Sequence, residues 1–152
     1  MKKLLIPSIF FVLLISFSFA QKPYKVVFYN LENFFDTIND PEVLDDEFTP
    51  DGPKKWNTAK YNKKLNNTER VLFDIAAIDK NYPIVIGVSE VETRGVLEDI
   101  VATPKLAPAN YRIAHFDSPE ARGVDVAFLY RPDVFKIEGQ YPVKTVIPSL
   151  PH

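Results

Sequence analysis

Apolar and polar positions divide the chain into short strand-like runs and one long helical stretch. Residues 25–29 form an apolar run that predicts a strand buried on both faces, and a second run predicts a strand over 83–89. Between them, apolar side chains recur every three or four residues, which predicts a helix over 58–79. Its packing face comprises Tyr61, Leu65, Thr68, Leu72 and Ile75. A strand, helix and strand in series favour a right-handed crossover, so we expect parallel strands.

The pattern beyond residue 89 predicts a short helix over 95–102, two antiparallel strands over 111–116 and 124–130, and another strand over 135–143. The expected fold is therefore α/β, with a mixed sheet flanked by helices. An acidic segment after the first strand contains Pro41, Pro50, Gly52 and Pro53, which predicts a loop. It lacks the alternation of a calcium-binding loop, so we interpret its carboxylates as solvated, with contacts to the rim of a substrate site as the minor alternative.

Two oxygen-bearing side chains stand where the two parallel strands end. Asn30 follows the first apolar run and Glu90 follows the second. Ligands of open α/β sheets bind outside the carboxyl ends of the strands, so the two side chains are expected to meet there. An amide beside a carboxylate suits a hard cation such as Mg²⁺, Mn²⁺ or Ca²⁺. On these two residues alone, the alternative of a strand-closing Asn and a solvated Glu is favoured.

Three longer segments change that balance. Tyr-Asn-Leu-Glu-Asn-Phe-Phe-Asp (29–36), Gly-Val-Ser-Glu-Val-Glu (87–92) and Asp-Ser-Pro-Glu-Ala-Arg-Gly-Val-Asp-Val-Ala-Phe-Leu-Tyr-Arg-Pro (117–132) occur in this order. Together they resemble the endonuclease/exonuclease/phosphatase family, in the deoxyribonuclease-I-like superfamily. The likeness runs from about Lys25 to Phe135 and is greatest to secreted bacterial members.

The resemblance implies about half of a four-layer α/β/β/α sandwich and assigns roles to several residues. Asn30 and Glu90 match the metal site, which would hold Mg²⁺ or Mn²⁺, with Ca²⁺ as a further option. Arg122 stands where relatives carry a Tyr that contacts the scissile phosphate, and a guanidinium can bind phosphate through two hydrogen bonds. The alternative for Arg122 is a solvated turn residue. Glu92 and Asp125 are secondary candidates, which would orient the metal ligands. The alternative is that each only caps its strand.

Relatives carry further motifs downstream: a catalytic His, Gly-Asp-x-Asn and Ser-Asp-His. This chain has only His115 and His152, so we expect it to be the N-terminal part of the family domain, over residues 21–152, and inactive alone. His115 alternates with Tyr111 and Ile113 on one strand face, which favours a partly buried structural His over a catalytic base.

The resemblance implies a metal-dependent phosphoesterase, most similar in activity to a nuclease that hydrolyses phosphodiester bonds. DNA or RNA is the favoured substrate, and sphingomyelin-type or small phosphate esters are the alternatives within the enzyme reading. The alternative from another class is a non-catalytic exported remnant or interaction fragment. No stable protein partner is inferred.

Residues 1–20 have the pattern of a signal peptide. Lys2 and Lys3 precede an apolar stretch, and Ser18-Phe19-Ala20 is a small-x-Ala cleavage site. We expect cleavage after Ala20, a periplasmic or extracellular protein and no membrane anchor afterwards. The alternative is an uncleaved anchor, which the short apolar run disfavours.

Composition narrows the class further. With 46% hydrophobic and 25% charged residues, the chain has the composition of a globular protein and the length of one domain at most. The absence of Cys excludes disulfides, thiolate nucleophiles and Cys-based zinc sites. Without Lys2 and Lys3, 16 basic residues face 20 acidic ones, so the mature protein is no generic polyanion binder. The only dense basic stretch is interpreted as a solvated helix face; it comprises Lys54, Lys55, Lys60, Lys63 and Lys64.

Overall fold

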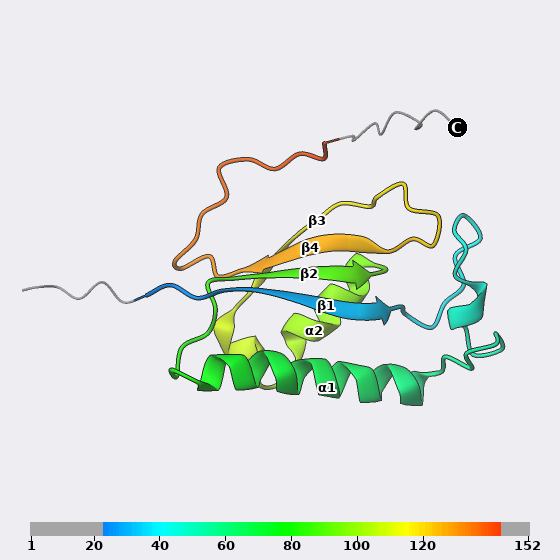
Figure 1. The fold of residues 1–152 in the computed structure, drawn as a ribbon, viewed down its shortest axis with the longest axis horizontal. Helices are drawn as coiled ribbons and strands as arrows, with labels where there is room; N and C mark the ends of the chain where they lie inside the picture. Colours follow the sequence, from blue (N-terminus) through cyan, green and yellow to red (C-terminus); the bar gives the residue numbers. More distant parts are fainter. Residues whose placement is uncertain (1–22, 144–152) are drawn as a thin grey trace, which may run out of the picture.

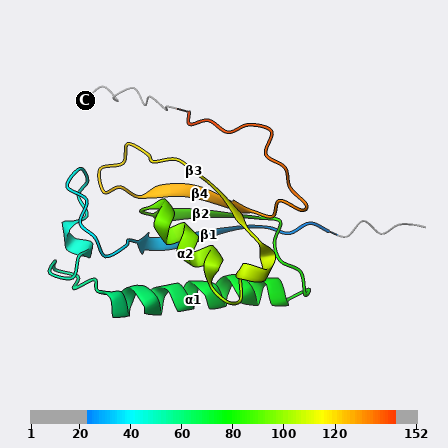
Figure 2. The same cartoon turned by 180° about the vertical axis from the view of Figure 1, so that it is seen from behind.

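The computed structural model describes residues 23–143, in which one four-stranded sheet carries two helices on the same face (Figures 1 and 2). The predicted signal peptide lies outside the described residues. The elements are β1 (Val26–Phe34), α1 (Thr58–Ala77), β2 (Val85–Val91), α2 (Arg94–Ala102), β3 (Arg112–His115) and β4 (Asp125–Tyr130), with short 3-10 turns η1 (Asp46–Phe48) and η2 (Ala107–Ala109). Neither helix of this part of the chain has the length and apolar character that crossing a membrane requires.

The strand order is β1-β2-β4-β3, so the sheet is mixed, as the sequence predicts. β1 and β2 pair in parallel, and β4 pairs antiparallel with both β2 and β3. α1 therefore forms the expected crossover between the two parallel strands. Side chains cap both helices: Asn57 accepts a hydrogen bond from the Lys60 amide (3.1 Å), and Thr93 accepts one from the Val96 amide (3.3 Å).

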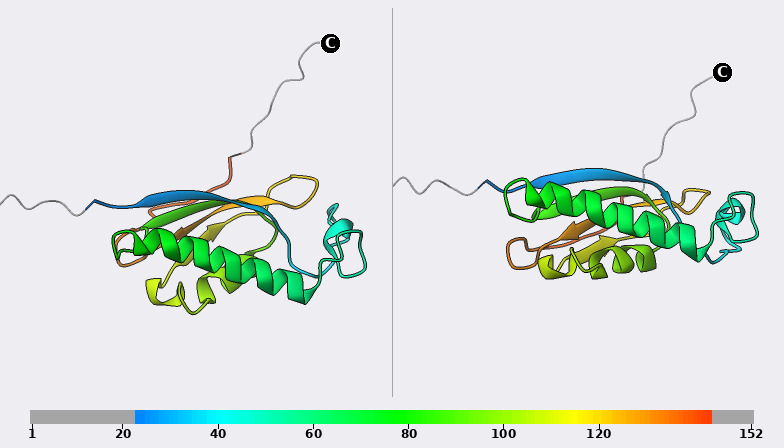
Figure 3. Two further views of the ribbon diagram at one scale, coloured as in Figure 1. Left: turned by 60° about the horizontal axis from the view of Figure 1, so that its bottom comes forward. Right: turned by 90° about the horizontal axis from the view of Figure 1, so that it is seen from below.

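The hydrophobic core lies between the sheet and the two helices, which cover one side of the sheet together (Figure 3). Tyr61, Thr68 and Leu72 of the predicted α1 face are buried, and Leu65 and Ile75 are half-buried. The Tyr61 hydroxyl donates to Asp99 of α2 (2.6 Å) and joins the helices. From α2 and the sheet, the core receives Val96, Leu97, Ile100, Ile86, Val88 and Leu129.

The prediction that the first strand is buried on both faces is wrong. Val26 and Phe28 are each 67% exposed, and Val126 and Phe128 of β4 are exposed on the same side. Both helices pack on the other side of the sheet. An apolar run in the sequence therefore does not show which face of the strand is covered by helices. Between the two phenylalanines lies Gly87, where an added Cβ would stand 2.8 Å from the Phe28 ring. Gly87 thus leaves room for aromatic side chains on the exposed face.

The prediction of a strand over 135–143 is also wrong. These residues form no strand; several of them line hollows together with Ala114 and Phe128 on the apolar sheet face. Figure 1 shows this segment on the side of the sheet away from α1. Both edges of β4 are already paired, and a segment that lies over a face cannot exchange backbone hydrogen bonds with the sheet.

The acidic loop between β1 and α1 is present, but its carboxylates are not all solvated as predicted. Asp45 is only 1% exposed, and its Oδ2 accepts a hydrogen bond from the Asp40 amide (2.9 Å). The rings of Phe35 and Phe48 stack at 4.0 Å, and the Trp56 indole donates to the Phe35 carbonyl (2.9 Å). These contacts bury one carboxylate and fix the loop on the end of the sheet.

Glu92, just after β2, holds the start of this loop. Its Oε2 accepts a hydrogen bond from the Asp36 amide (2.6 Å), and the side chain is buried. Burial raises the pKa of Glu92 to about 8; the Asp36 amide hydrogen bond opposes this rise, and the negative charges of Asp36 and Asp45 add to it.

This pKa shift predicts that stability falls as pH rises. The folded protein retains a proton on Glu92 that the unfolded chain loses near pH 4.5, so the contribution is complete below that pH and is lost as pH approaches about 8. Glu92→Gln keeps a neutral donor and acceptor at the position. In urea unfolding with EDTA from about pH 4.5 to 8, we expect the variant to gain on the wild type steadily as pH rises.

The matched control is Glu98→Gln, which removes an exposed carboxylate from α2. We expect its pH profile to run parallel to that of the wild type. If the Glu92→Gln profile is parallel as well, the raised pKa of Glu92 is refuted.

Candidate metal site

Two irregularities lie side by side at the carboxyl ends of β1 and β2. Asn30 pairs with Ser89 and Phe34 pairs with Val91, so three residues of β1 stand opposite Glu90 alone. On the other edge of β2, Ser89 pairs with Val126 and Val91 with Asp125, which leaves Glu90 as an extra residue. Glu90 is therefore the residue of a β-bulge, a feature that redirects side chains near sites.

The backbone at these bulges has an uncommon conformation. Glu32, Asn33 and Glu90 have φ values of 55°, 59° and 58°, in the left-handed region that non-glycine residues seldom occupy. Each such residue costs on the order of 1 kcal/mol and persists only where surrounding contacts fix it. The contacts of Glu90 supply that constraint.

The bulges bring Asn30 and Glu90 together. Asn30 Nδ2 donates to Glu90 Oε1, and the Asn33 amide donates to Glu90 Oε2, each at 3.0 Å. Asn30 Oδ1 in turn accepts a hydrogen bond from the Glu32 amide at 2.7 Å. The Asn30 amide therefore has a fixed orientation, in which its NH₂ group faces the carboxylate.

This donor set fits a hard cation. Glu90 forms no direct ion pair with a Lys or Arg among the described residues, although its negative charge acts on the ammonium of Lys64. Each of its oxygens has accepted one hydrogen bond and keeps a further lone pair, as does Asn30 Oδ1. Oxygen ligands with a free negative charge suit Mg²⁺, Mn²⁺ or Ca²⁺.

Arg122 reaches this edge from the loop between β3 and β4. Its Nη1 donates to Asn33 Oδ1 (3.1 Å), and its Nε donates to Glu120 Oε1 (3.0 Å). The Arg122 hydrogen bond holds the pKa of the exposed Glu120 carboxyl below its usual range. Asn33 thus contacts Glu90 through its backbone amide and Arg122 through its side chain. The sequence did not identify Asn33 as a site residue.

Lys64 on α1 supports the bulge from the helix side and was likewise not singled out as a site residue. Its ammonium donates to the carbonyls of Glu32 (2.6 Å) and Asn33 (3.4 Å). Burial lowers the pKa of Lys64, and the negative charges of Glu32 and Glu90 oppose that shift. In the sequence, the spacing of Lys64 from Tyr61 and Thr68 indicates only that it lies near one face of a helix. The carbonyls to which it donates hydrogen bonds are identified only by the structure.

Glu92 and Asp125 hold loops around the site, and no hydrogen bond among the described residues joins either to Glu90. The Asp125 carboxylate accepts a hydrogen bond from the Ser118 amide (2.7 Å), and its Oδ2 lies 2.9 Å from His115 Nε2. The side chains of His115 and Asp125 are each 3% exposed. His115 is partly buried, as the sequence predicts, and its structural role stays a prediction. The pair anchors the loop that carries Arg122.

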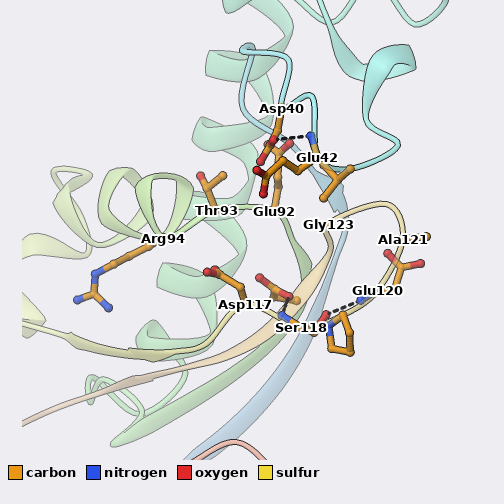
Figure 4. A pocket seen from close by; sticks show the side chains of 13 residues that line it. Asp40, Glu42, Glu92, Thr93, Arg94, Asp117, Ser118, Glu120, Ala121 and Gly123 are labelled. Atoms are coloured by element: carbon orange, nitrogen blue, oxygen red, sulfur yellow. Dashed lines mark hydrogen bonds between the residues drawn. The ribbon is translucent and has the colours of Figure 1, made fainter. Parts of the chain in front are cut away.

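A second set of metal-capable side chains exists in the described part of the chain. Ligand atoms of His115, Asp117 and Asp125 all lie within 4.8 Å of one another. Asp117 and Asp125 border a hollow of about 570 Å³, and Figure 4 shows the acidic side chains that gather around it. Its carboxylates are Asp40, Glu42, Glu92, Asp117, Glu120 and Asp125. Arg94, the one basic residue in its lining, is paired with Glu98, so the hollow repels anions.

Comparison with known protein families gives one match, to the model of the Endonuclease/Exonuclease/phosphatase family, over residues 25–152. Comparisons with curated proteins and with solved structures give no match. The family comprises hydrolases of the phosphoesterase and nuclease type that generally use divalent metal ions. Because the family model matches residues 25–152, which are most of the chain, the chain belongs to the endonuclease/exonuclease/phosphatase family.

Proposed function

We propose that this protein, as part of a complete family domain, hydrolyses phosphodiester bonds in the manner of a nuclease, with Mg²⁺ or Mn²⁺ bound at Glu90 and Asn30. The observation that carries the proposal is the double bulge, which directs Asn30 and the Asn33 amide onto the Glu90 carboxylate at 3.0 Å. Arg122 lies at the same edge through Asn33 (3.1 Å). A carboxylate, an amide and a guanidinium at one sheet edge suit a metal and a phosphate together.

Each residue has a distinct part in this proposal. A divalent ion, when bound, stabilises negative charge on phosphoryl and leaving-group oxygens. Glu90 supplies the charge that holds the ion, and two N–H donors fix its carboxylate before the ion arrives. Arg122 would exchange its contacts with Asn33 and Glu120 for a phosphate, which its planar fork can bind through two hydrogen bonds.

For the enzymatic function, DNA or RNA is the proposed substrate, and sphingomyelin-type or small phosphate esters are the alternatives. The second candidate function, an exported interaction fragment without activity, draws on one observation: Val26, Phe28, Val126 and Phe128 form an exposed apolar sheet face. Hydrolysis that depends on both metal and Glu90, measured in a protein that contains the complete family domain, separates the two candidates.

We further propose that the protein is exported and processed. N-terminal sequencing of the exported protein should begin at Gln21, because Ser18-Phe19-Ala20 presents small residues at the cleavage site. A mature protein that retains residues 1–20 in a membrane fraction would refute this localisation.

The 152-residue chain alone is expected to turn over no phosphodiester. The His115 side chain is buried against Asp125, so no imidazole of the described residues is free to activate water beside Glu90. The measurement is release of product from DNA, RNA and bis-(4-nitrophenyl) phosphate with Mg²⁺ or Mn²⁺. Metal-dependent cleavage that Glu90→Ala abolishes would contradict this expectation.

In a protein that contains the complete family domain, the site variants should follow a fixed order. Glu90→Gln should lower kcat by roughly two orders of magnitude or more, because it removes the charge at the ion. Asn30→Ala should cost less, because a water can replace a neutral ligand. Arg122→Lys should weaken substrate binding and leave metal dependence unchanged, since Lys keeps the charge and loses the fork.

The measurement is turnover of a phosphodiester against Mg²⁺ concentration for each variant. Glu98→Gln, which removes an exposed carboxylate on α2, is the matched control and should behave as the wild type. A folded Glu90→Gln variant with wild-type turnover and metal dependence would rule out Glu90 as a ligand.

A further inference from the structure

A groove lies between α1 and β1 and reaches the candidate site. It has a volume of about 380 Å³, and both Asn30 and Glu32 line it, so it opens at the β1 bulge. The rest of its lining comes mostly from the first half of α1. Those groove residues are Trp56, Lys60, Lys63, Lys64, Asn67, Thr68 and Val71, with Tyr29 and Leu31 from β1.

The groove is basic. Three lysines line it against one carboxylate, that of Glu32. None of the ion pairs within residues 23–143 involves these lysines. Lys60 Nζ donates to the Lys54 carbonyl and Lys64 Nζ to the Glu32 carbonyl, each at 2.6 Å, so backbone oxygens hold two ammonium groups in place without neutralising them. An ammonium has three N–H donors, of which Lys60 uses one and Lys64, which also donates to the Asn33 carbonyl, uses two.

Two aromatic side chains line the same groove. Tyr29 and Trp56 are both half-buried, and the Trp56 ring is fixed by its hydrogen bond to the Phe35 carbonyl and by an edge contact with Phe48 at 6.3 Å. Lys64 Nζ lies over the Trp56 ring, 5.8 Å from its centroid, so a base stacks only on the ring surface that Lys64 does not cover. Fixed aromatic rings beside cationic side chains are the combination that binds single-stranded nucleic acids, because bases stack on rings while lysines neutralise phosphates. A small phosphate ester has no use for a groove of this kind.

We propose that this groove binds a single strand of nucleic acid next to the scissile phosphate. The proposal rests on the proposed function and deepens it, since it names the substrate as a single-stranded polynucleotide. It also revises the interpretation of Lys60, Lys63 and Lys64 as a solvated helix face. The acidic hollow near Asp117 and Asp125 repels phosphates, so the strand makes its contacts on the α1 side of the site.

The test uses Trp56, which is the only tryptophan of the chain. Oligo(dT) is titrated into the full chain in EDTA, where hydrolysis cannot occur, and both Trp fluorescence and the anisotropy of labelled oligonucleotide are recorded. Stacking on the groove should quench Trp56 in step with the anisotropy change. Duplex DNA of the same length and inorganic phosphate at equal phosphate concentration should produce little quenching.

Lys63→Glu is the first variant, because Lys63 is exposed and forms no ion pair with any described residue, so its replacement should leave the fold intact. The second variant carries Lys60→Gln and Lys63→Gln. Each lost phosphate contact should lower the slope of log affinity against log salt by about 0.7, which corresponds to roughly fivefold weaker binding near 0.1 M salt. The control carries Lys80→Gln and Lys136→Gln, which remove equal charge outside the groove and should change neither slope nor quenching.

Several outcomes overturn the proposal. One is oligonucleotide binding without quenching of Trp56, and another is an equal loss of affinity in the groove and control variants. Competition by inorganic phosphate as strong as that by oligo(dT) would replace the strand with a single anion. Because the titration is metal-free, it can succeed where the Glu90 assignment fails, and it can fail where that assignment holds.

Discussion

The Glu90 carboxylate is the contact on which the site end of the molecule depends. It accepts a hydrogen bond from each of two β1 residues, and both bonds require the left-handed backbone of the bulges. The bulge frees backbone groups of Glu32 from the ladder, and side chains supply their hydrogen-bond partners. Lys64 supplies one to the Glu32 carbonyl, and Asn30 Oδ1 supplies one to the Glu32 amide. Carboxylate, amide and ammonium therefore hold a strained backbone that the sheet alone would not hold.

Two buried carboxylates extend this arrangement to the loops. Glu92 accepts from the Asp36 amide and so holds the start of the acidic loop, while Asp125 fixes the β3–β4 loop through Ser118 and His115. The Leu44 amide donates to the Ala121 carbonyl (2.8 Å), so the two loops also contact each other directly. Both loops are thereby positioned by the strand ends. Arg122 reaches Asn33 because its loop is anchored on the sheet.

Charge is distributed unevenly about the site. The hollow beside β4 is lined by six carboxylates, whereas the groove beside α1 is lined by three lysines. A net charge of −2 over the whole chain conceals this difference, because it is a sum over all surfaces of the chain. A phosphate near Glu90 therefore meets attraction on one side and repulsion on the other. Local charge, and not net charge, decides where an anionic ligand can extend.

Periodicity in the sequence determined the mixed α/β sheet and the extent of α1, because these depend on local patterns. The first strand was predicted to end before Asn30, whereas β1 continues through the bulge to Phe34. The exposed face of β1, the burial of Asp45 and the absence of a strand over 135–143 depend on which layers cover which residues, and an apolar run carries no record of its cover. The sequence did not reveal the roles of Asn33 and Lys64 either. They arise from backbone groups that a bulge leaves unpaired, and only the tertiary pairing of β1 with β2 creates that bulge.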